Sequence, residues 1–331
     1  MGPLRRLGAL FSLCVAGVMV LSCGDEVAVE HAASRHRLSC PRANHLPFTL
    51  ESDGFQDPAH ELLDGPRADI AEDTLGDATG VVSSTDEGLD SPPRARNVYY
   101  VGRKARKGSP DANAPTPIGN ELVSLWFFDD RESRWARAGR GPTDAGGWYR
   151  FLDTAAERAM PEPVYAVLEG DGSCAAHFDA LYPAGTSVVV TDIDRVLARE
   201  DGSEATGASR AMNAWAKKGY PVVYLTWRHD DARAVTREWL DAHVMPGGAL
   251  ITGPADPRLK TVWLDRMANA FGWTFEAAYA GSAEDANTYW HAGAGAARIF
   301  RIGEASGDTS VAIEDFDTHV EDFIDAQPEA R

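Results

Sequence analysis

The chain has 331 residues, a formal net charge of −18 and the composition of an ordinary globular protein, with 44% hydrophobic and 25% charged residues. This length is enough for about two domains of ~100–200 residues each. The acidic balance argues against a nucleic-acid partner, because phosphate backbones are bound by basic patches. A single pocket on an acidic protein can still be positive, so a local phosphate site is not excluded.

The N-terminal residues have the pattern of a signal peptide. Arg5 and Arg6 precede an apolar stretch over residues 7–21, which is shorter than the ~20 residues of a membrane span. Cys23 follows this stretch in a sequence that resembles a bacterial lipobox. We therefore expect residues 1–23 to be a lipoprotein signal peptide, with Cys23 carrying a palmitate-type lipid. A plain signal peptide with an incidental cysteine is the alternative.

A lipid on Cys23 would anchor the protein to a membrane of the bacterial cell envelope, on its periplasmic or outer-membrane face. Once the signal is removed, Cys40 and Cys174 are the remaining thiols. Pairing between these two is possible in an oxidising compartment. Their spacing gives no geometric support, so the disulfide is left open.

Residues 24–94 are expected to form a disordered acidic linker. Between Glu51 and Asp90 the sequence has 12 acidic residues and one basic residue, Arg67. Gly, Ser, Thr and Pro lie between the charges, aromatic residues are few, and no hydrophobic period is sustained. Such a composition is typical of a solvated tether.

Residues 95–185 are predicted to form a small Ig-like β-sandwich. Short β-prone stretches alternate with turn signals here, at residues 97–101, 122–128, 143–151 and 163–168. Catalytic residue types do not cluster in this region, which favours a structural or docking module.

Residues 186–331 alternate strands and helices, which predicts a Rossmann-like parallel sheet with helices on both faces. The expected strands are 187–192, 222–225, 249–251, 275–279 and 298–302. The expected helices are 209–218, 232–243, 258–271, 285–291 and 314–326.

The first of these strands ends in two aspartates, Asp192 and Asp194. Residues i and i+2 of an extended chain point to the same side, so both carboxyl groups are expected where the strand stops. In open α/β sheets, ligands bind at the carboxyl ends of the strands. Two carboxylates there can act as nucleophile and general acid/base, or bind a hard metal ion.

Three further polar residues follow later strands: Thr226, Lys260 and Asp285. Together with Thr191-Asp192-Ile193-Asp194, this order resembles the haloacid dehalogenase superfamily over residues 186–305. The stretches 219–228, 285–289 and 297–303 are similar to the C-terminal catalytic domain of lipins, which are magnesium-dependent phosphatidate phosphatases. A preceding β-sandwich also resembles the lipin arrangement.

The resemblance implies a mechanism. Asp192 would attack phosphorus to give an aspartyl-phosphate, and Asp194 would act as general acid and then base. Thr226 and Lys260 would hydrogen-bond the phosphoryl oxygens. Mg²⁺ would be bound by Asp192, Asp285 and the backbone carbonyl of Asp194.

Two positions depart from the family pattern. Arg195 stands where the family usually has glycine, and the stretch before Asp285 lacks the asparagine found in lipins. Arg195, Arg228 and His229 are also candidates for a cationic rim that contacts a phosphate or lipid headgroup. Surface charge is the alternative for all three.

The favoured function is an envelope-anchored, Mg²⁺-dependent phosphatase acting on phosphatidate or a related small phosphomonoester. The alternative is a non-catalytic lipoprotein that binds phosphate-bearing lipid or protein through a degenerate phosphatase domain. A third possibility is that the sandwich carries the function and the phosphatase domain is a relic. The short loops around the expected site favour a large or membrane-held substrate.

Overall fold

A computed structural model describes residues 67–330, apart from 72–73, 78–80, 85–88, 96–97, 107–115, 118, 130–131, 133, 154–163, 170–173, 230–231 and 254–255. All described residues belong to one compact unit, Ser39–Arg331. The signal peptide (1–23), its Cys23 and the first part of the expected linker lie outside them and stay predictions. Across the described residues, no helix combines the length and the apolar character needed to cross a bilayer.

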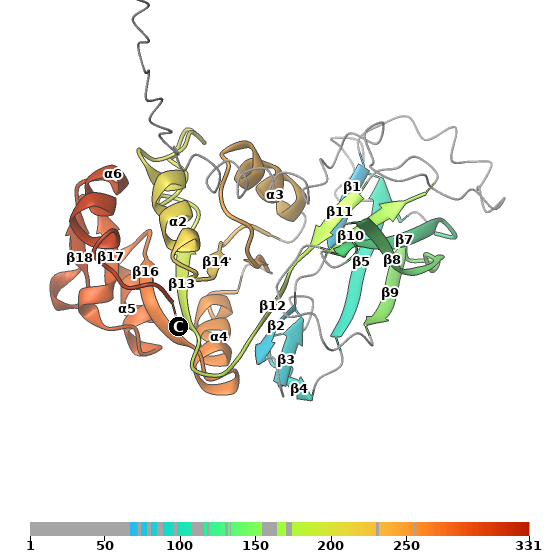
Figure 1. Cartoon of the computed structure of the whole chain (residues 1–331), viewed down its shortest axis with the longest axis horizontal. Coiled ribbons are helices and arrows are strands. Elements are labelled where there is room, and N and C mark those ends of the chain that lie inside the picture. The colour runs from blue at the N-terminus through green and yellow to red at the C-terminus, as the bar shows by residue number, and fades with distance from the viewer. Residues whose placement is uncertain are drawn as a thin grey trace, which may run out of the picture. The chain divides into compact units, whose positions relative to one another are not determined.

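The chain from Ser187 onward forms the predicted parallel sheet (Figure 1). Its strands in sequence order are β13 (Ser187–Asp192), β14 (Val222–Leu225), β15 (Leu250–Ile251), β16 (Thr274–Tyr279), β17 (Ile299–Ile302) and β18 (Val311–Ile313). The spatial order is β15-β14-β13-β16-β17-β18. The connections therefore reverse direction between β13 and β16, and such a switch point is where doubly wound sheets bind ligands.

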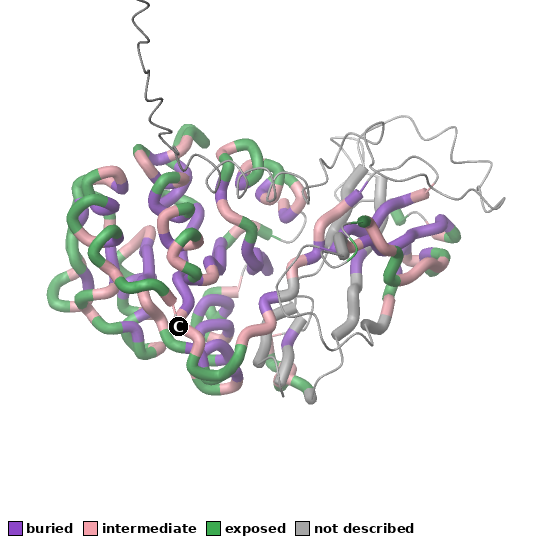
Figure 2. Tube along the Cα trace, viewed as in Figure 1, coloured by how far each residue is buried: buried purple, intermediate pink, exposed green. Residues whose placement is uncertain are grey.

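Helices cover both faces of this sheet, as predicted. They are α2 (Ala208–Lys217), α3 (Arg233–Ala242), α4 (Leu259–Asp265) continued by η4 (Arg266–Ala270), α5 (Ala283–His291), and α6 (Phe316–His319) continued by η7 (Val320–Ile324). Val189 packs in a core with α2, α3 and α6, whereas Val188 and Val190 pack with α4 and α5. The strands β13, β14 and β15 are buried, and the outward faces of the helices are exposed (Figure 2).

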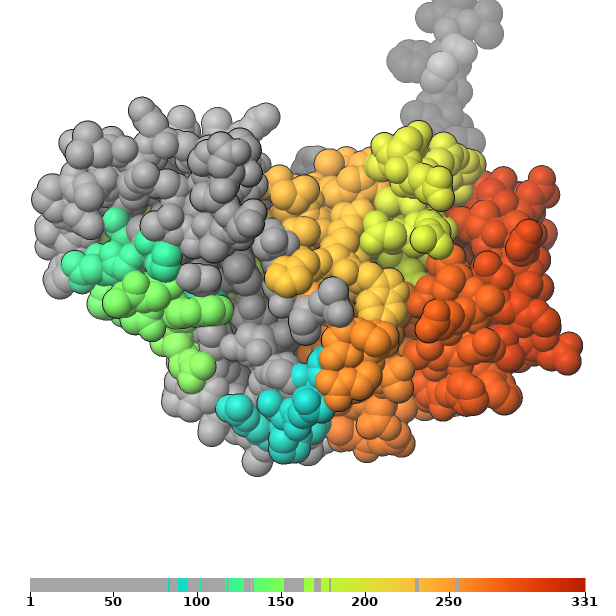
Figure 3. All heavy atoms as spheres, turned by 180° about the vertical axis from the view of Figure 1, so that it is seen from behind, coloured from blue at the N-terminus to red at the C-terminus, as the bar shows by residue number. Residues whose placement is uncertain are grey.

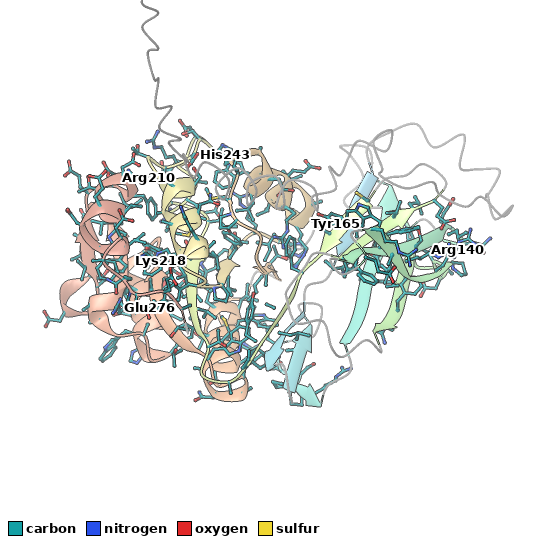
Figure 4. The ribbon with its side chains drawn as sticks, in the orientation of Figure 1. Arg140, Tyr165, Arg210, Lys218, His243 and Glu276 are labelled. Carbon is teal, nitrogen blue, oxygen red and sulfur yellow. The ribbon has the colours of Figure 1, made fainter. Side chains whose placement is uncertain are left out.

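Helix α2 also binds the C-terminal segment through polar contacts. The Arg210 guanidinium contacts Asp317 at 3.1 Å and Glu321 at 3.2 Å. The Lys218 ammonium donates to the carbonyls of Asp325 and Gln327. Figure 4 labels Arg210 and Lys218, which extend this contact along α2.

The first part of the chain contains an antiparallel β-sandwich, which confirms the expected fold class. In one sheet, β5 (Val98–Arg106) pairs with β1 (Arg67–Ala71), β6 (Thr116–Pro117) and β9 (Trp148–Asp153). The other has the order β11 (Cys174–His177), β10 (Val164–Leu168), β7 (Leu122–Asp129) and β8 (Arg134–Pro142). Side chains of both sheets share a core, in which the Tyr149 hydroxyl lies 2.7 Å from Nε2 of His177.

Cys174, the first residue of β11, is disulfide-bonded. Cys40, whose pairing with Cys174 the sequence left open, lies outside the described residues. The structure therefore shows that the Cys174 thiol is oxidised, and the identity of its partner stays open.

The prediction of a disordered linker over residues 24–94 is wrong for its C-terminal part. Besides β1, this part contains β2 (Thr74–Asp77) and β3 (Val81–Ser84), which form a third sheet with β4 (Arg94–Ala95) and β12 (Asp179–Tyr182). Its C-terminal end is also bound by the buried Arg266, which donates to Ser83 Oγ and to the Ser91 carbonyl. The acidic, turn-rich composition of this segment gives no local signal for these long-range contacts.

Candidate functional site

Asp192 and Asp194 differ in burial and in partners, although both lie at the carboxyl end of β13. Asp192 is 2% exposed, whereas Asp194 lies on the surface. The structure brings Asp192 together with Lys260 and Asp285, and it brings Asp194 together with Thr226 and Arg228. The five residues predicted for catalysis and metal binding therefore form two hydrogen-bonded groups.

Both carboxylate oxygens of Asp192 accept hydrogen bonds from the protein. Oδ1 accepts from the Tyr289 hydroxyl at 2.6 Å and lies 2.8 Å from the Lys260 ammonium. Oδ2 accepts from the backbone N–H of Gly281 at 2.9 Å. Burial nevertheless raises the pKa of Asp192 to about 6, because the hydrogen bonds and the ammonium only partly offset desolvation.

Asp285 is the second partner of the Lys260 ammonium, at 2.6 Å through its Oδ1. Its Oδ2 accepts from the Ser282 hydroxyl, which also caps the N-terminus of α5 by accepting from the Asp285 N–H. Burial acts to raise the pKa of Asp285, but the ammonium and the hydroxyl outweigh burial and leave that pKa below its usual value. Lys260 is thus a buried counter-ion shared by two carboxylates.

Asp194 is bound by the residues that follow β14. Its Oδ2 accepts from Oγ1 of Thr226 at 2.9 Å. Its Oδ1 accepts from Nε of Arg228 at 3.0 Å and from Nη2 at 2.7 Å. The Asp194–Arg228 ion pair is partly exposed, so water screens its charges. The pair therefore orients the two side chains more than it stabilises the fold.

Arg195 has a left-handed backbone conformation, with φ at 63°. Only glycine adopts this conformation without steric cost, which explains why a glycine at this position would be usual in the resembled family. The side chain of Arg195 is exposed, and among the described residues its guanidinium has no hydrogen-bond or ion-pair partner.

The donor set at this site does not fit a resident magnesium ion. All four oxygens of Asp192 and Asp285 already accept hydrogen bonds or lie against the ammonium. The cation between these two carboxylates is therefore the Lys260 ammonium.

An open pocket of about 340 Å³ lies beside this network. It is lined by Trp227, Pro257, Ser282, Glu284 and Asp285. The Trp227 side chain is 42% exposed, and the centre of its ring lies 5.0 Å from the Lys260 ammonium. Figure 3 shows the surface of the α/β part from behind, in yellow to red.

Sequence reasoning missed Tyr289, Gly281 and Trp227. Tyr289 lies one helical turn after Asp285, so a buried pair on one face of a helix was a signal that could have found it. No local sequence pattern identifies the Gly281 N–H as a donor to Asp192, because this hydrogen bond depends on the pairing of β13 with β16. His229 is exposed, and no role in the site follows from its position.

The fold and these contacts can now be compared with known proteins. Residues 188–303 match the family model described as the LNS2 domain of PITM 1-3. We call this stretch the LNS2-like domain. The match agrees with the haloacid dehalogenase-like fold that the sequence predicted.

Three similar proteins come from animals. The chain is 30% identical over 197 residues to human membrane-associated phosphatidylinositol transfer protein 3, covering 56% of this chain and 20% of that protein. It is 29% identical to protein retinal degeneration B of Drosophila melanogaster, covering 43% and 12%. It is 27% identical to rat membrane-associated phosphatidylinositol transfer protein 1, covering 57% and 16%. The chain thus spans a fifth or less of the length of these relatives.

Proposed function

We propose that the LNS2-like domain is a non-catalytic module that binds the phosphate of a phospholipid headgroup. The observation that carries this proposal is the state of Asp192. A nucleophile must reach its substrate, whereas this carboxylate is 2% exposed and faces Tyr289, Lys260 and Gly281 within the protein.

Asp194, the predicted general acid/base, is also hydrogen-bonded within the protein. Asp194 would have to exchange a proton with the substrate, but Arg228 and Thr226 hold both of its oxygens. This arrangement supports binding over turnover, because it fixes the two carboxylates as partners of cations.

The phosphate-binding groups we assign are Arg195 and Arg228. Guanidinium groups bind phosphate through paired N–H donors. Arg195 is exposed and offers its donors to a ligand, while Arg228 stays bound to Asp194 and Thr236 and its partly exposed guanidinium has further N–H groups to donate.

Two further observations support a lipid as the carrier of the phosphate. The relatives are named as phosphatidylinositol transfer proteins, so their names associate similar sequences with phospholipids. Trp227 is exposed beside the site, and tryptophan is favoured where an apolar surface meets water.

We further propose that the lipid anchor on Cys23 raises the local concentration of the domain at a membrane. The disulfide at Cys174 is compatible with the oxidising cell envelope that this anchor implies. Attachment would offset the repulsion between a chain of net charge −18 and anionic membranes.

Calorimetry with soluble lipids tests binding without interference from the anchor. The full chain is titrated with monomeric dihexanoyl phospholipids and with dihexanoylglycerol, which lacks the phosphate. We expect binding of the phospholipids alone, weakened about tenfold or more in Arg195→Ala and Arg228→Ala, since each loses a charge-assisted contact. Arg210→Ala, which removes an arginine paired on α2, is the control and should bind normally. Equal binding of dihexanoylglycerol would overturn the proposal.

A further inference from the structure

Thr236 is a fully buried residue whose hydroxyl contacts a phosphate-binding arginine. It lies on the inner face of α3, together with Arg233 and Leu240, and is 0% exposed. Its Oγ1 accepts a hydrogen bond from Nη1 of Arg228 at 3.2 Å. A polar group inside the protein is therefore paired with a guanidinium that is itself partly exposed.

The direction of this hydrogen bond follows from the second contact of the hydroxyl. Thr236 donates its single hydroxyl hydrogen to the carbonyl of Ala232, one helical turn earlier, at 2.8 Å. The lone pairs of the oxygen are then left for a donor, and a guanidinium has donors only. The backbone of α3 thus sets the hydroxyl in the orientation that accepts from Arg228.

The guanidinium of Arg228 is held by two different residues. Its Nε and Nη2 donate to Oδ1 of Asp194, at 3.0 and 2.7 Å. Its Nη1 donates to Thr236. Among the described residues these contacts use three of the five N–H groups of the guanidinium, so one N–H on each terminal nitrogen remains for a ligand.

The contact with Thr236 restricts a motion that the ion pair with Asp194 permits. Both hydrogen bonds to Asp194 end on one oxygen atom, so the guanidinium can still pivot about that oxygen. The ion pair is also screened by water, because both side chains are partly exposed. The contact with the buried Thr236 opposes the pivoting, because it fixes a third N–H away from that oxygen.

We propose that Thr236 is a positioning residue for phosphate binding, which holds Arg228 in the orientation that the ligand requires. This inference rests on the proposed function and adds to it a residue that acts through Arg228. An arginine that is already ordered loses less conformational entropy when it binds phosphate. The affinity for phosphate therefore depends on the Thr236 hydroxyl only while Arg228 is present.

The test measures the affinity of the full chain for monomeric dihexanoylphosphatidate by calorimetry. Thr236→Val keeps the shape of the side chain and removes the hydroxyl, and we expect it to weaken binding about fivefold, the effect of one hydrogen bond. Thr236→Ser restores the hydroxyl and should bind within about twofold of the original chain. Thr252→Val is the matched control and should bind normally, because Thr252 is also buried but accepts from Nη1 of Arg233.

A double-mutant cycle separates positioning from a merely structural role. In the Arg228→Ala background, Thr236→Val should cause no further loss of affinity, since the group that Thr236 positions is gone. NMR of the ligand-free chain follows Arg228 directly through its Nε–H signal, which is assigned by its absence in Arg228→Ala. This signal should broaden or shift in Thr236→Val, because the guanidinium becomes mobile. Thr236→Ala replaces the valine variant if that variant does not fold.

The outcomes separate this inference from the proposed function. Unchanged affinity or an unchanged Nε–H signal in Thr236→Val overturns the inference and keeps phosphate binding. An equal loss in Thr252→Val, or a loss in Thr236→Val that persists in the Arg228→Ala background, overturns it as well. If the original chain binds phosphatidate no more tightly than dihexanoylglycerol, the proposed function itself is overturned, and the role of Thr236 in binding with it.

Discussion

Lys260 lies with its ammonium 2.8 Å from Oδ1 of Asp192, and both side chains are buried. Asp285 completes this network at 2.6 Å from the same nitrogen. Asp192 is the residue expected to attack a phosphate, and Lys260 is a residue expected to bind it. In this contact their opposite charges neutralise each other.

Lys260→Met should destabilise the protein by about 3–5 kcal/mol, because it leaves two carboxylates buried without their counter-ion. Urea denaturation at pH 7 measures the free energy of unfolding. The triple variant that adds Asp192→Asn and Asp285→Asn should regain most of this loss, since no buried charge remains. A loss below ~1 kcal/mol in the single variant would show that the network is not a buried ion pair.

Arg195→Gly should raise the free energy of unfolding by about 0.5–1 kcal/mol, because glycine adopts the left-handed φ of 63° without steric cost. The gain is net of the extra freedom that glycine has in the unfolded chain. Thermal unfolding measures the change. Glu200→Gly, at an exposed position without positive φ, is the control and should destabilise. Destabilisation by both variants would mean that the backbone at Arg195 is relaxed.

Arg266→Ala should destabilise the chain by about 2–3 kcal/mol, because this buried guanidinium donates to Ser83 and Ser91. Residues 83–91 should then become sensitive to proteases, which mass spectrometry of the fragments detects. Arg258→Ala removes the exposed contact of the same segment, at Asp90, and should cost less than ~1 kcal/mol. Equal sensitivity of both variants would argue against Arg266 as the main attachment.

His319 should make the protein less stable as the pH falls from about 6.5 towards 4. Burial lowers the pKa of this imidazole to about 4 in the folded state, so between these values the unfolded chain binds the proton more readily. The stability is therefore present above the unfolded pKa and is lost progressively below it. Denaturation of His319→Gln across this range should show a smaller acid loss, whereas the exposed His291→Gln should behave as the original chain. Parallel curves for His319→Gln and the original chain would refute this account.

The sequence predicted the α/β part well because its signals are local. Apolar runs ending in polar residues predicted β13 and β14, and Gly219 marked the end of the helix that the structure shows as α2. The carboxyl ends of β13 and β14 in one parallel sheet then explain why Asp194 and Thr226 meet.

The elements that the sequence did not predict are formed by contacts between residues distant in the chain. The acidic segment pairs as β2 and β3 with partners that include β12, about a hundred residues away. The short strand β18 has two exposed residues and gave no periodic signal.

The hydrogen bonds that Asp192 accepts from Tyr289 and Gly281 could not be predicted either. These bonds depend on the register of β13 against β16 and on the residue at which α5 begins. The residue types in the predicted motif are those of a phosphatase. Only the hydrogen bonds of Asp192 and Asp194 favour a non-catalytic, phosphate-binding module instead.

One measurement tests the central claim, that this domain binds a phosphorylated headgroup without hydrolysing it. Phosphorus NMR of the full chain with dihexanoylphosphatidate follows binding and inorganic phosphate in the same sample, with and without magnesium. We predict a broadened or shifted lipid signal and no phosphate release above that of Asp192→Asn. Magnesium-dependent release that disappears in Asp192→Asn would contradict the account and restore the phosphatase.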